Sequence, residues 1–262
     1  MVIEPGSGWP GDPGDRRTPV AVDADDVVRL AGNAPSLDRL DARVSVCRAC
    51  PRLVEWRERV AETKRAAFAD EPYWGRPIAG WGAARPRIAI VGLAPAAHGG
   101  NRTGRIFTGD RSGDWLFAAL HRAGLAELPT STHAGDGQHL IGVRMMAAVR
   151  CAPPANKPTP AERDTCRPWL EHELTFLRPT LRVVVALGGF AWSALWPSLV
   201  NAGYHVPARR RRFGHLAEVA TDDGLSVLGS YHPSQQNTFT GKLTEPMLDA
   251  VFTRARELAG LI

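Results

Sequence analysis

Residues 88–120 read IAIVGLAPAAHGGNRTGRIFTGDRSGDWLFAAL. The stretch opens with an apolar run typical of a buried strand and closes with apolar residues at helical spacing after Ser112, which can cap a helix. The long loop between them is rich in glycine and polar side chains, a composition more typical of a site than of a spacer. Because it contains neither G-x-G-x-x-G nor G-x-x-x-x-G-K-[ST], the sequence disfavours a phosphate-cradling nucleotide loop.

Apolar runs and helical patterns alternate along the rest of the chain. Further strands are predicted at 142–149, 181–187 and 225–230, and helices at 112–123, 160–174, 190–200 and 244–260. Continuous apolar strands that alternate with helices indicate an α/β fold with three α/β/α layers around a central, four-stranded, mostly parallel sheet. Ligands bind such sheets outside the carboxyl ends of the strands. We therefore expect four loops to meet there: 92–111, 151–158, 188–189 and 231–243.

Length and composition fit one globular domain. The chain has 262 residues, 44% of them hydrophobic, with a net charge of +5 and a pI near 9.4. This excess of basic residues is compatible with a polyanionic partner but does not by itself indicate one. Residues 1–35 are rich in Gly, Pro and Asp, so we expect a disordered tail there and a single domain over 36–262. No stretch has signal-peptide or membrane-spanning length, so we expect a cytoplasmic protein without a membrane partner.

The four cysteines form the pattern C-x2-C…C-x14-C: Cys47 and Cys50, then Cys151 and Cys166. Disulfides are rare in the cytosol, and four thiolates are compatible with either zinc or a [4Fe–4S] cluster. The alternative is four buried core thiols, which the charged neighbours Arg48 and Arg52 disfavour. A structural role is favoured over a redox role, because these ligands would tie the N-terminal helices to the loop and helix after the second strand.

Several motifs together resemble the uracil-DNA glycosylase superfamily, and most closely its family 5, the iron–sulfur UDGb type. They are Gly-x-x-Pro at 92–95, Arg-x-Phe-Thr-Gly at 105–109, Arg-Cys-x-Pro-Pro-x-Asn-Lys at 150–157 and His-Pro-Ser at 232–234. The resemblance covers residues 45–255. It implies the fold of that superfamily, a [4Fe–4S] cofactor and a monofunctional DNA glycosylase. Such an enzyme hydrolyses the bond between a flipped base and deoxyribose, for uracil and for other deaminated bases such as hypoxanthine, and leaves an abasic site.

The first motif departs from most of the superfamily, because the stretch Gly92-Leu93-Ala94-Pro95-Ala96 has no polar side chain where relatives carry Asp, Asn or Glu to position water. Asp110 is the sole carboxylate between Gly92 and Gly113, and it matches the acid of the family-5 pattern. We hypothesise that Asp110 stabilises positive charge on the sugar and orients or deprotonates water. The alternative is a carboxylate that only favours the start of the helix near Ser112.

The resemblance also implies roles for other side chains. His232 would donate to a base carbonyl oxygen as a neutral imidazole. Phe107 would stack on the extruded base, unless it only packs in the core. Asn156 would help hold the base or water, and His98 and Asn101 would line the pocket or contact the sugar. Ala147 and Ala148 replace larger residues of some relatives, which favours a loose pocket and broad selectivity.

The expected partner is double-stranded DNA with a damaged base, bound by a monomer. Loop 233–242 should enter the minor groove, although it has Gln235-Gln236 where many relatives place an apolar wedge. The side chains expected to contact DNA are Arg102, Arg105, Lys157, Ser234, Gln235, Gln236, Asn237 and Lys242. The run Arg209–Arg212 would add a basic patch, or form only a solvated loop.

Two other functions stay open on the sequence. One is a strictly uracil-specific iron–sulfur glycosylase, which the missing acid of the first motif disfavours. The other is a non-catalytic module that binds nucleic acid through a basic surface and a four-cysteine centre. A carboxylate such as Asp110 has no purpose in a cationic loop of such a module, because it would repel phosphate.

Overall fold

A mixed six-stranded sheet forms the centre of the protein, and the computed structural model describes residues 2–209 and 211–261. The strands are β1 (Trp81–Gly82), β2 (Ile88–Gly92), β3 (Val143–Ala147), β4 (Val183–Leu187), β5 (Glu218–Ala220) and β6 (Ser226–Ser230). Their order is β1-β3-β2-β4-β6-β5. The inner four strands are parallel, and the edge strands β1 and β5 pair antiparallel with β3 and β6.

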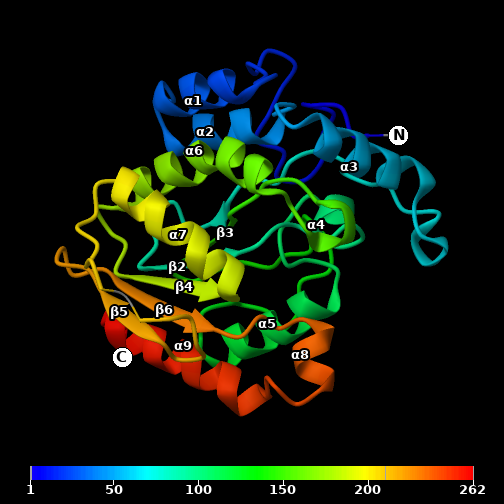
Figure 1. Cartoon of the computed structure of the whole chain (residues 1–262). Coiled ribbons are helices and arrows are strands. Elements are labelled where there is room, and N and C mark those ends of the chain that lie inside the picture. The colour runs from blue at the N-terminus through cyan, green and yellow to red at the C-terminus, as the bar shows by residue number, and fades with distance from the viewer. Residues whose placement is uncertain (1, 210, 262) are drawn as a thin grey trace.

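Helices cover both faces of the sheet (Figure 1). They are α1 (Ala24–Gly32), α2 (Leu37–Ser45), α3 (Pro51–Thr63), α4 (Gly100–Thr103), α5 (Arg111–Arg122), α6 (Pro160–Leu177), α7 (Gly189–Asn201), α8 (Gln235–Phe239) and α9 (Glu245–Ala259), with 3-10 turns η1 (Ala66–Phe68) and η2 (Pro154–Asn156). Helices α5 and α9 lie on one face and α6 and α7 on the other, with α1 and α2 packed outside α6. The expected three-layer α/β/α architecture is confirmed.

The parallel register places the carboxyl ends of the four inner strands at one edge. Gly92 lies opposite Ala147, and Leu187 opposite Ser230. All residues of β2, β3 and β4 are buried, as expected for strands covered on both faces. The sequence predicted these strands but missed β1 and β5, because two or three residues at a sheet edge leave almost no periodicity to detect.

Local capping explains where the main helices begin. The Thr159 side chain accepts from the Glu162 amide while the Glu162 carboxylate accepts from the Thr159 amide, so the predicted capping box at the start of α6 is confirmed. Asp110 caps α5 by accepting from the Gly113 amide at 2.9 Å. An N-cap of this kind stabilises a helix by about 1 kcal/mol, so the candidate catalytic carboxylate is also fixed in place by the fold.

The prediction of disorder over residues 1–35 is wrong for the described part of this segment. Helix α1 is capped by Asp23 and buries Val27, Leu30 and Ala31 in a cluster shared with α2 and Trp169 of α6. Residues 2–14 also pack against the domain, through contacts described below. Glycine and proline dominate the composition of the segment, but the tertiary contacts of a few apolar and acidic residues outweigh the cost of ordering it. Met1 and Ile262 lie outside the described residues.

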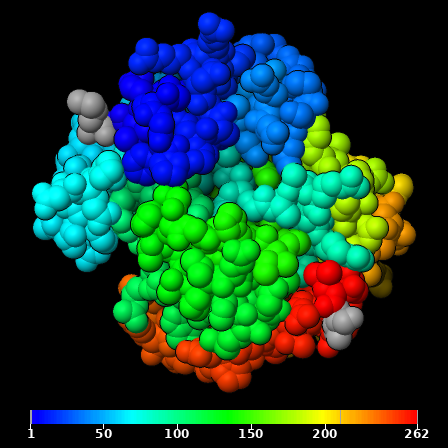
Figure 2. Space-filling view, turned by 180° about the vertical axis from the view of Figure 1, so that it is seen from behind, coloured from blue at the N-terminus to red at the C-terminus, as the bar shows by residue number. Residues whose placement is uncertain are grey.

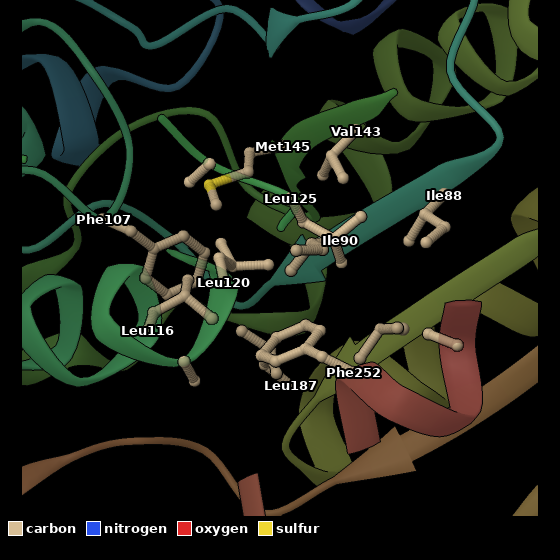
Figure 3. Close-up of a cluster of buried hydrophobic side chains, with 14 of the residues drawn as sticks. Ile88, Ile90, Phe107, Leu116, Leu120, Leu125, Val143, Met145, Leu187 and Phe252 are labelled. Carbon is tan, nitrogen blue, oxygen red and sulfur yellow. The ribbon is translucent and has the colours of Figure 1, made fainter. Parts of the chain in front are cut away.

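The larger core cluster lies between the sheet and helices α5 and α9. It includes Ile88, Ile90, Leu116 and Phe252, with Phe107 at its margin (Figure 3). This cluster therefore reaches the loop edge of the sheet. Over the described residues, no helix is long and apolar enough to cross a membrane.

Candidate active site and cysteine cluster

Loops from four strands meet at the carboxyl edge of the sheet, as the sequence predicted. The Ala148 amide donates to the Gly92 carbonyl at 3.0 Å, and the Gly188 amide donates to the Ser230 carbonyl at 2.8 Å. These bonds hold each loop beside the neighbouring strand end. Side chains that are far apart in the chain are thereby brought to one place.

Phe107 and His232 form the centre of this edge. Their ring centroids lie 6.0 Å apart at an interplanar angle of 39°. Phe107 is only 6% exposed and has a φ of 54°, a left-handed backbone that non-glycine residues seldom adopt. Such strained conformations cluster at functional sites.

Two glycines make room for Phe107. A Cβ atom on Gly92 would lie 2.6 Å from the Phe107 Cζ, and one on Gly113 would lie 2.1 Å from the Phe107 carbonyl oxygen. A side chain at either position would displace the ring or its backbone. Gly92 therefore gives the Phe107 ring its place, and its assignment to the substrate pocket stays a prediction.

Asp110 lies three residues after Phe107 on the same loop. Its Oδ1 accepts from the Gly113 amide, and its Oδ2 faces Gly99, where a Cβ would lie only 2.1 Å away. Burial raises the pKa of the Asp110 carboxyl, although hydrogen bonds from the Gly113 and Ser112 amides oppose this. The helix-start interpretation and the catalytic one are compatible, because Oδ1 serves the cap while Oδ2 points to the glycine loop.

His232 is held neutral by its surroundings. Burial lowers the pKa of the imidazole to about 4. The side-chain amide of Asn237 donates to the His232 carbonyl at 2.9 Å, and a Cβ on Gly188 would lie 3.4 Å from the His232 Cβ. A neutral imidazole donates a hydrogen bond without carrying charge, as expected from the sequence.

The structure overturns the assignment of Arg102 and Arg105 to the DNA surface. Arg102 is 7% exposed, pairs with Glu71, and donates to the carbonyls of His98 and Gly109. Arg105 is 9% exposed and donates to both carboxylate oxygens of Asp136 at 2.6 Å. Both guanidiniums are internal supports of the loop, since both are buried and paired with a carboxylate of the protein.

The two weaker pocket candidates also have structural partners. The Tyr73 hydroxyl lies 3.0 Å from His98 Nδ1, and the Asn101 side-chain amide donates to the Arg57 carbonyl at 3.1 Å. Asn101 is 1% exposed. It therefore joins α4 to α3 instead of facing solvent at the mouth of the site. Ala94, the remaining pocket candidate, packs against the cluster of Leu53, Val149 and Cys151.

The loop after β3 is exposed at its tip. Asn156 ends η2 with φ 55°, next to Ala155 with φ 52°, and among the described residues its side chain has no hydrogen-bond partner. Lys157 is also exposed. The functional roles of Asn156 and Lys157 stay predictions about the complex with DNA.

The loop after β6 presents polar side chains and one aromatic ring to solvent. Ser234 precedes α8, whose Gln235 and Gln236 are exposed, as is Lys242 beyond it. Phe239 is 67% exposed, and the guanidinium carbon of Arg111 lies 5.1 Å from its ring centroid. Sequence reasoning missed Phe239, whose signal was an aromatic residue within a polar loop. Arg209, Arg211 and Arg212 are exposed, whereas Arg210 lies outside the described residues.

The four cysteines line one small cavity between the start of α3, the loop after β3 and α6. Burial and the neighbouring thiols raise the pKa of Cys47 to about 11 and of Cys50 to about 12. Arg57, which is 1% exposed, donates to the Cys151 sulfur at 2.9 Å, and the Arg150 amide donates to the Cys166 sulfur at 3.3 Å. Donors to sulfur stabilise thiolates, so these contacts fit a centre with thiolate ligands.

The spacing of the thiols bears on which group they fit. Over the described residues, no group of three or more Cys, His, Asp or Glu side chains is placed to hold a metal ion. One zinc ion draws its sulfur ligands in to about 2.3 Å. The four thiols share a cavity whose apolar walls come from Leu53, Val54 and Trp169.

Comparison with known proteins decides the family. Residues 79–256 match the family described as the uracil DNA glycosylase superfamily. The chain belongs to this superfamily. As a member of the uracil DNA glycosylase superfamily it is a DNA glycosylase, a hydrolase that acts on N-glycosidic bonds in DNA.

Named relatives cover almost the entire chain. A protein of Mycobacterium bovis named type-5 uracil-DNA glycosylase is 59% identical over 99% of this chain and 95% of its own length. Proteins with the same name from Thermus thermophilus and Pyrobaculum aerophilum are 51% and 45% identical, over 83% and 84% of this chain and 96% and 92% of their own. The expected family is therefore confirmed.

Proposed function

We propose that this protein excises uracil and other deaminated bases, including hypoxanthine, from double-stranded DNA and leaves abasic sites. The observation that supports the proposal is the pairing of the Phe107 and His232 rings, 6.0 Å apart at the carboxyl edge of the sheet, with Asp110 on the same loop as Phe107. The uracil-DNA glycosylase names of the relatives support the uracil substrate. We also propose that it acts as a monomer in the cytoplasm.

The reaction follows from the chemistry of these side chains. The target base leaves the duplex stack and stacks on the Phe107 ring, a contact worth about 1–3 kcal/mol. The oxygen of water bonds to the anomeric carbon while the N-glycosidic bond breaks, and the base leaves with the bonding electrons and later takes up a proton. His232 donates to a carbonyl oxygen of the departing base, where negative charge accumulates.

Asp110 acts on the sugar side. Positive charge develops on the deoxyribose as the bond breaks, and an ionised carboxylate stabilises it while orienting the attacking water. Oδ1 is held by the Gly113 amide, so Oδ2 is the oxygen that would face the water. Broad selectivity follows from Gly92, Ala147 and Ala148, because these small residues offer no side chain that reads the base edge.

Cys47, Cys50, Cys151 and Cys166 are proposed to hold a [4Fe–4S] cluster. The four-thiol donor set, the shared cavity and the Arg57 contact to the Cys151 sulfur support a thiolate-bound group, and the resemblance to the iron–sulfur family favours the cluster over zinc. When bound, the cluster would supply structural cross-linking between the α2–α3 junction and the loop that leads into α6.

DNA binding is proposed for the exposed residues of the loops after β3 and β6. Lys157 and Lys242 would contact phosphates, and Ser234, Gln235, Gln236 and Asn237 would lie along the minor groove. Phe239 adds the apolar side chain that Gln235 and Gln236 lack. Apolar side chains inserted at a base step help to unstack it, so Phe239 is the proposed wedge.

The test uses duplex oligonucleotides with one uracil or one hypoxanthine, followed by alkaline cleavage at abasic sites. Wild type should yield breaks at both lesions, and Asp110→Asn should lower the rate by roughly a hundredfold to ten-thousandfold. Asp114→Asn removes the same charge from the exposed side of α5 and is the matched control. Breaks at uracil alone would indicate a uracil-specific enzyme, and binding without any break would indicate a non-catalytic module.

A further inference from the structure

The N-terminal arm, residues 2–14, lies against the rear of the loop that carries Asp110. Figure 2 shows the N-terminal segment in dark blue packed directly on the green surface of residues 100–135. The Ile3 amide donates to the Trp74 carbonyl at 3.2 Å, and Val2 pairs with Tyr73 in a parallel bridge. The arm therefore adds a short extended segment beside residues 73–74.

Asp12 organises the arm and anchors it. Its Oδ1 accepts from the Gly14 amide at 3.0 Å and from Arg76 Nη2 at 2.5 Å, and its Oδ2 accepts from the Gly6 amide at 3.1 Å. The side chains of Asp12 and Arg76 are 4% and 6% exposed. A buried ion pair with these additional hydrogen bonds holds the arm in one conformation, because breaking it would leave an unpaired buried charge.

Trp9 gives the arm an aromatic contact with the loop. Its ring centroid lies 5.9 Å from that of Trp74, and the Arg76 guanidinium covers the Trp74 ring at 3.8 Å. Trp9 also meets Gly104, the residue that ends α4 with φ 76°. A Cβ on Gly104 would lie 2.8 Å from Trp9 Nε1, so the indole packs directly against the Gly104 backbone.

Hydrogen bonds through Arg102 connect the contact between Trp9 and Trp74 to the loop segment that carries Asp110. The Trp74 amide donates to the Arg102 carbonyl at 2.9 Å, which ties residues 73–75 to α4. The Arg102 Nη2 then donates to the carbonyl of Gly109 at 2.8 Å, the residue before Asp110. One continuous set of contacts thus runs from Asp12 and Trp9 to the carboxylate.

We propose that the N-terminal arm is a positioning element of the active site, in which Trp9 and Asp12 fix α4 and Arg102 and thereby the carboxylate of Asp110. The proposal rests on the proposed function, since it assumes that Asp110 acts in base excision. The arm precedes the part of the chain that matches the family, which starts at residue 79. Trp9 and Asp12 contact no substrate and act only through the loop.

The first test compares single-turnover excision and duplex affinity for Trp9→Ala, Trp9→Phe and Asp12→Asn. Small displacements of catalytic groups cost up to about a hundredfold in rate, so we expect Trp9→Ala and Asp12→Asn to lose about tenfold or more while the duplex Kd changes little. Trp9→Phe, which keeps a ring on Trp74, should retain most of the rate. Ser7→Ala, on the exposed face of the arm, is the matched control.

A second test removes the arm and returns it. A variant lacking residues 2–14 should excise slowly, its loop 98–110 should exchange amide hydrogen faster, and a synthetic peptide of residues 2–20 should restore both properties. The same peptide with Trp9→Ala should restore neither. A deletion variant with wild-type rate and unchanged exchange in loop 98–110 would overturn the proposal while leaving the proposed function intact. If wild type itself cleaves neither lesion, the proposed function fails and this proposal fails with it.

Discussion

The rings of Phe107 and His232 lie 6.0 Å apart, although one follows β2 and the other follows β6. Parallel pairing of β2 with β4, and of β4 with β6, brings these two loops to the same edge. Phe107 faces the core with most of its surface, so its position depends on packing as much as on the loop. A change that moves this ring should therefore alter catalysis.

Gly92→Ala tests the position of the ring. The new Cβ would lie 2.6 Å from the Phe107 Cζ, so the ring must shift away from its place beside His232. We expect excision to slow by about tenfold to a hundredfold, since small misplacements in a site have effects of this size. Gly32→Ala, whose added Cβ makes only ordinary contacts at 3.8 Å in α1, serves as the control. Equal rates for the two variants would contradict the assigned role of the ring.

The pH dependence of single-turnover excision should show one acid limb, from Asp110. The reaction needs the ionised carboxylate, and burial raises the pKa of this group above its usual 3.8. The rate should therefore rise with pH through that raised pKa and then stay level. His232 has a pKa of about 4 and stays neutral across the neutral range, so no limb is expected near 6.5. A limb near 6.5 that disappears in His232→Gln would refute this assignment.

Cys166→Ser should remove a ligand of the proposed cluster. We expect iron and acid-labile sulfide to fall together in the purified variant, because a four-thiolate site loses the group when one ligand is lost. The midpoint of thermal unfolding should fall as well, since the site joins α3 to α6. Zinc in place of iron in the wild-type protein would contradict the cluster.

Phe239→Ala tests the proposed wedge. The side chain is 67% exposed, so its removal should leave thermal stability unchanged while excision from duplex DNA slows. Excision from single-stranded DNA should change much less, because no stacked pair has to be opened. Val200→Ala, an exposed apolar residue on α7, is the control. An equal effect on both substrates would argue against a wedge.

Replacing a buried arginine and replacing an exposed lysine should have different effects on stability and on DNA binding. Arg105→Ala breaks the buried pair with Asp136 and should destabilise the protein by about 3–5 kcal/mol without changing the salt dependence of DNA binding. Lys157→Ala should leave the free energy of unfolding unchanged and lower the slope of log affinity against log salt by about 1. Denaturant melts and binding titrations at several salt concentrations measure both effects. If Arg105→Ala instead lowered the salt dependence of DNA binding without destabilising the protein, Arg105 would belong to the DNA-binding surface.

The sequence by itself determined the inner strands, the helices that follow them and the edge at which the loops meet. Apolar runs and caps such as Thr159 with Glu162 act locally, so they can be read from neighbouring residues. It also indicated Phe107, Asp110 and His232, because distinctive motifs carry them.

Only the tertiary structure decided which polar side chains face inward. Arg102 and Arg105 looked like phosphate ligands, but their partners Glu71 and Asp136 lie about thirty residues away in the chain. The same limit applies to the N-terminal arm. Its composition indicated disorder, but in the structure the Asp12–Arg76 ion pair and the Trp9–Trp74 ring contact order it. The residue type shows which interactions a side chain can make. Which residue becomes its partner is decided only when segments distant in the chain come together in the fold.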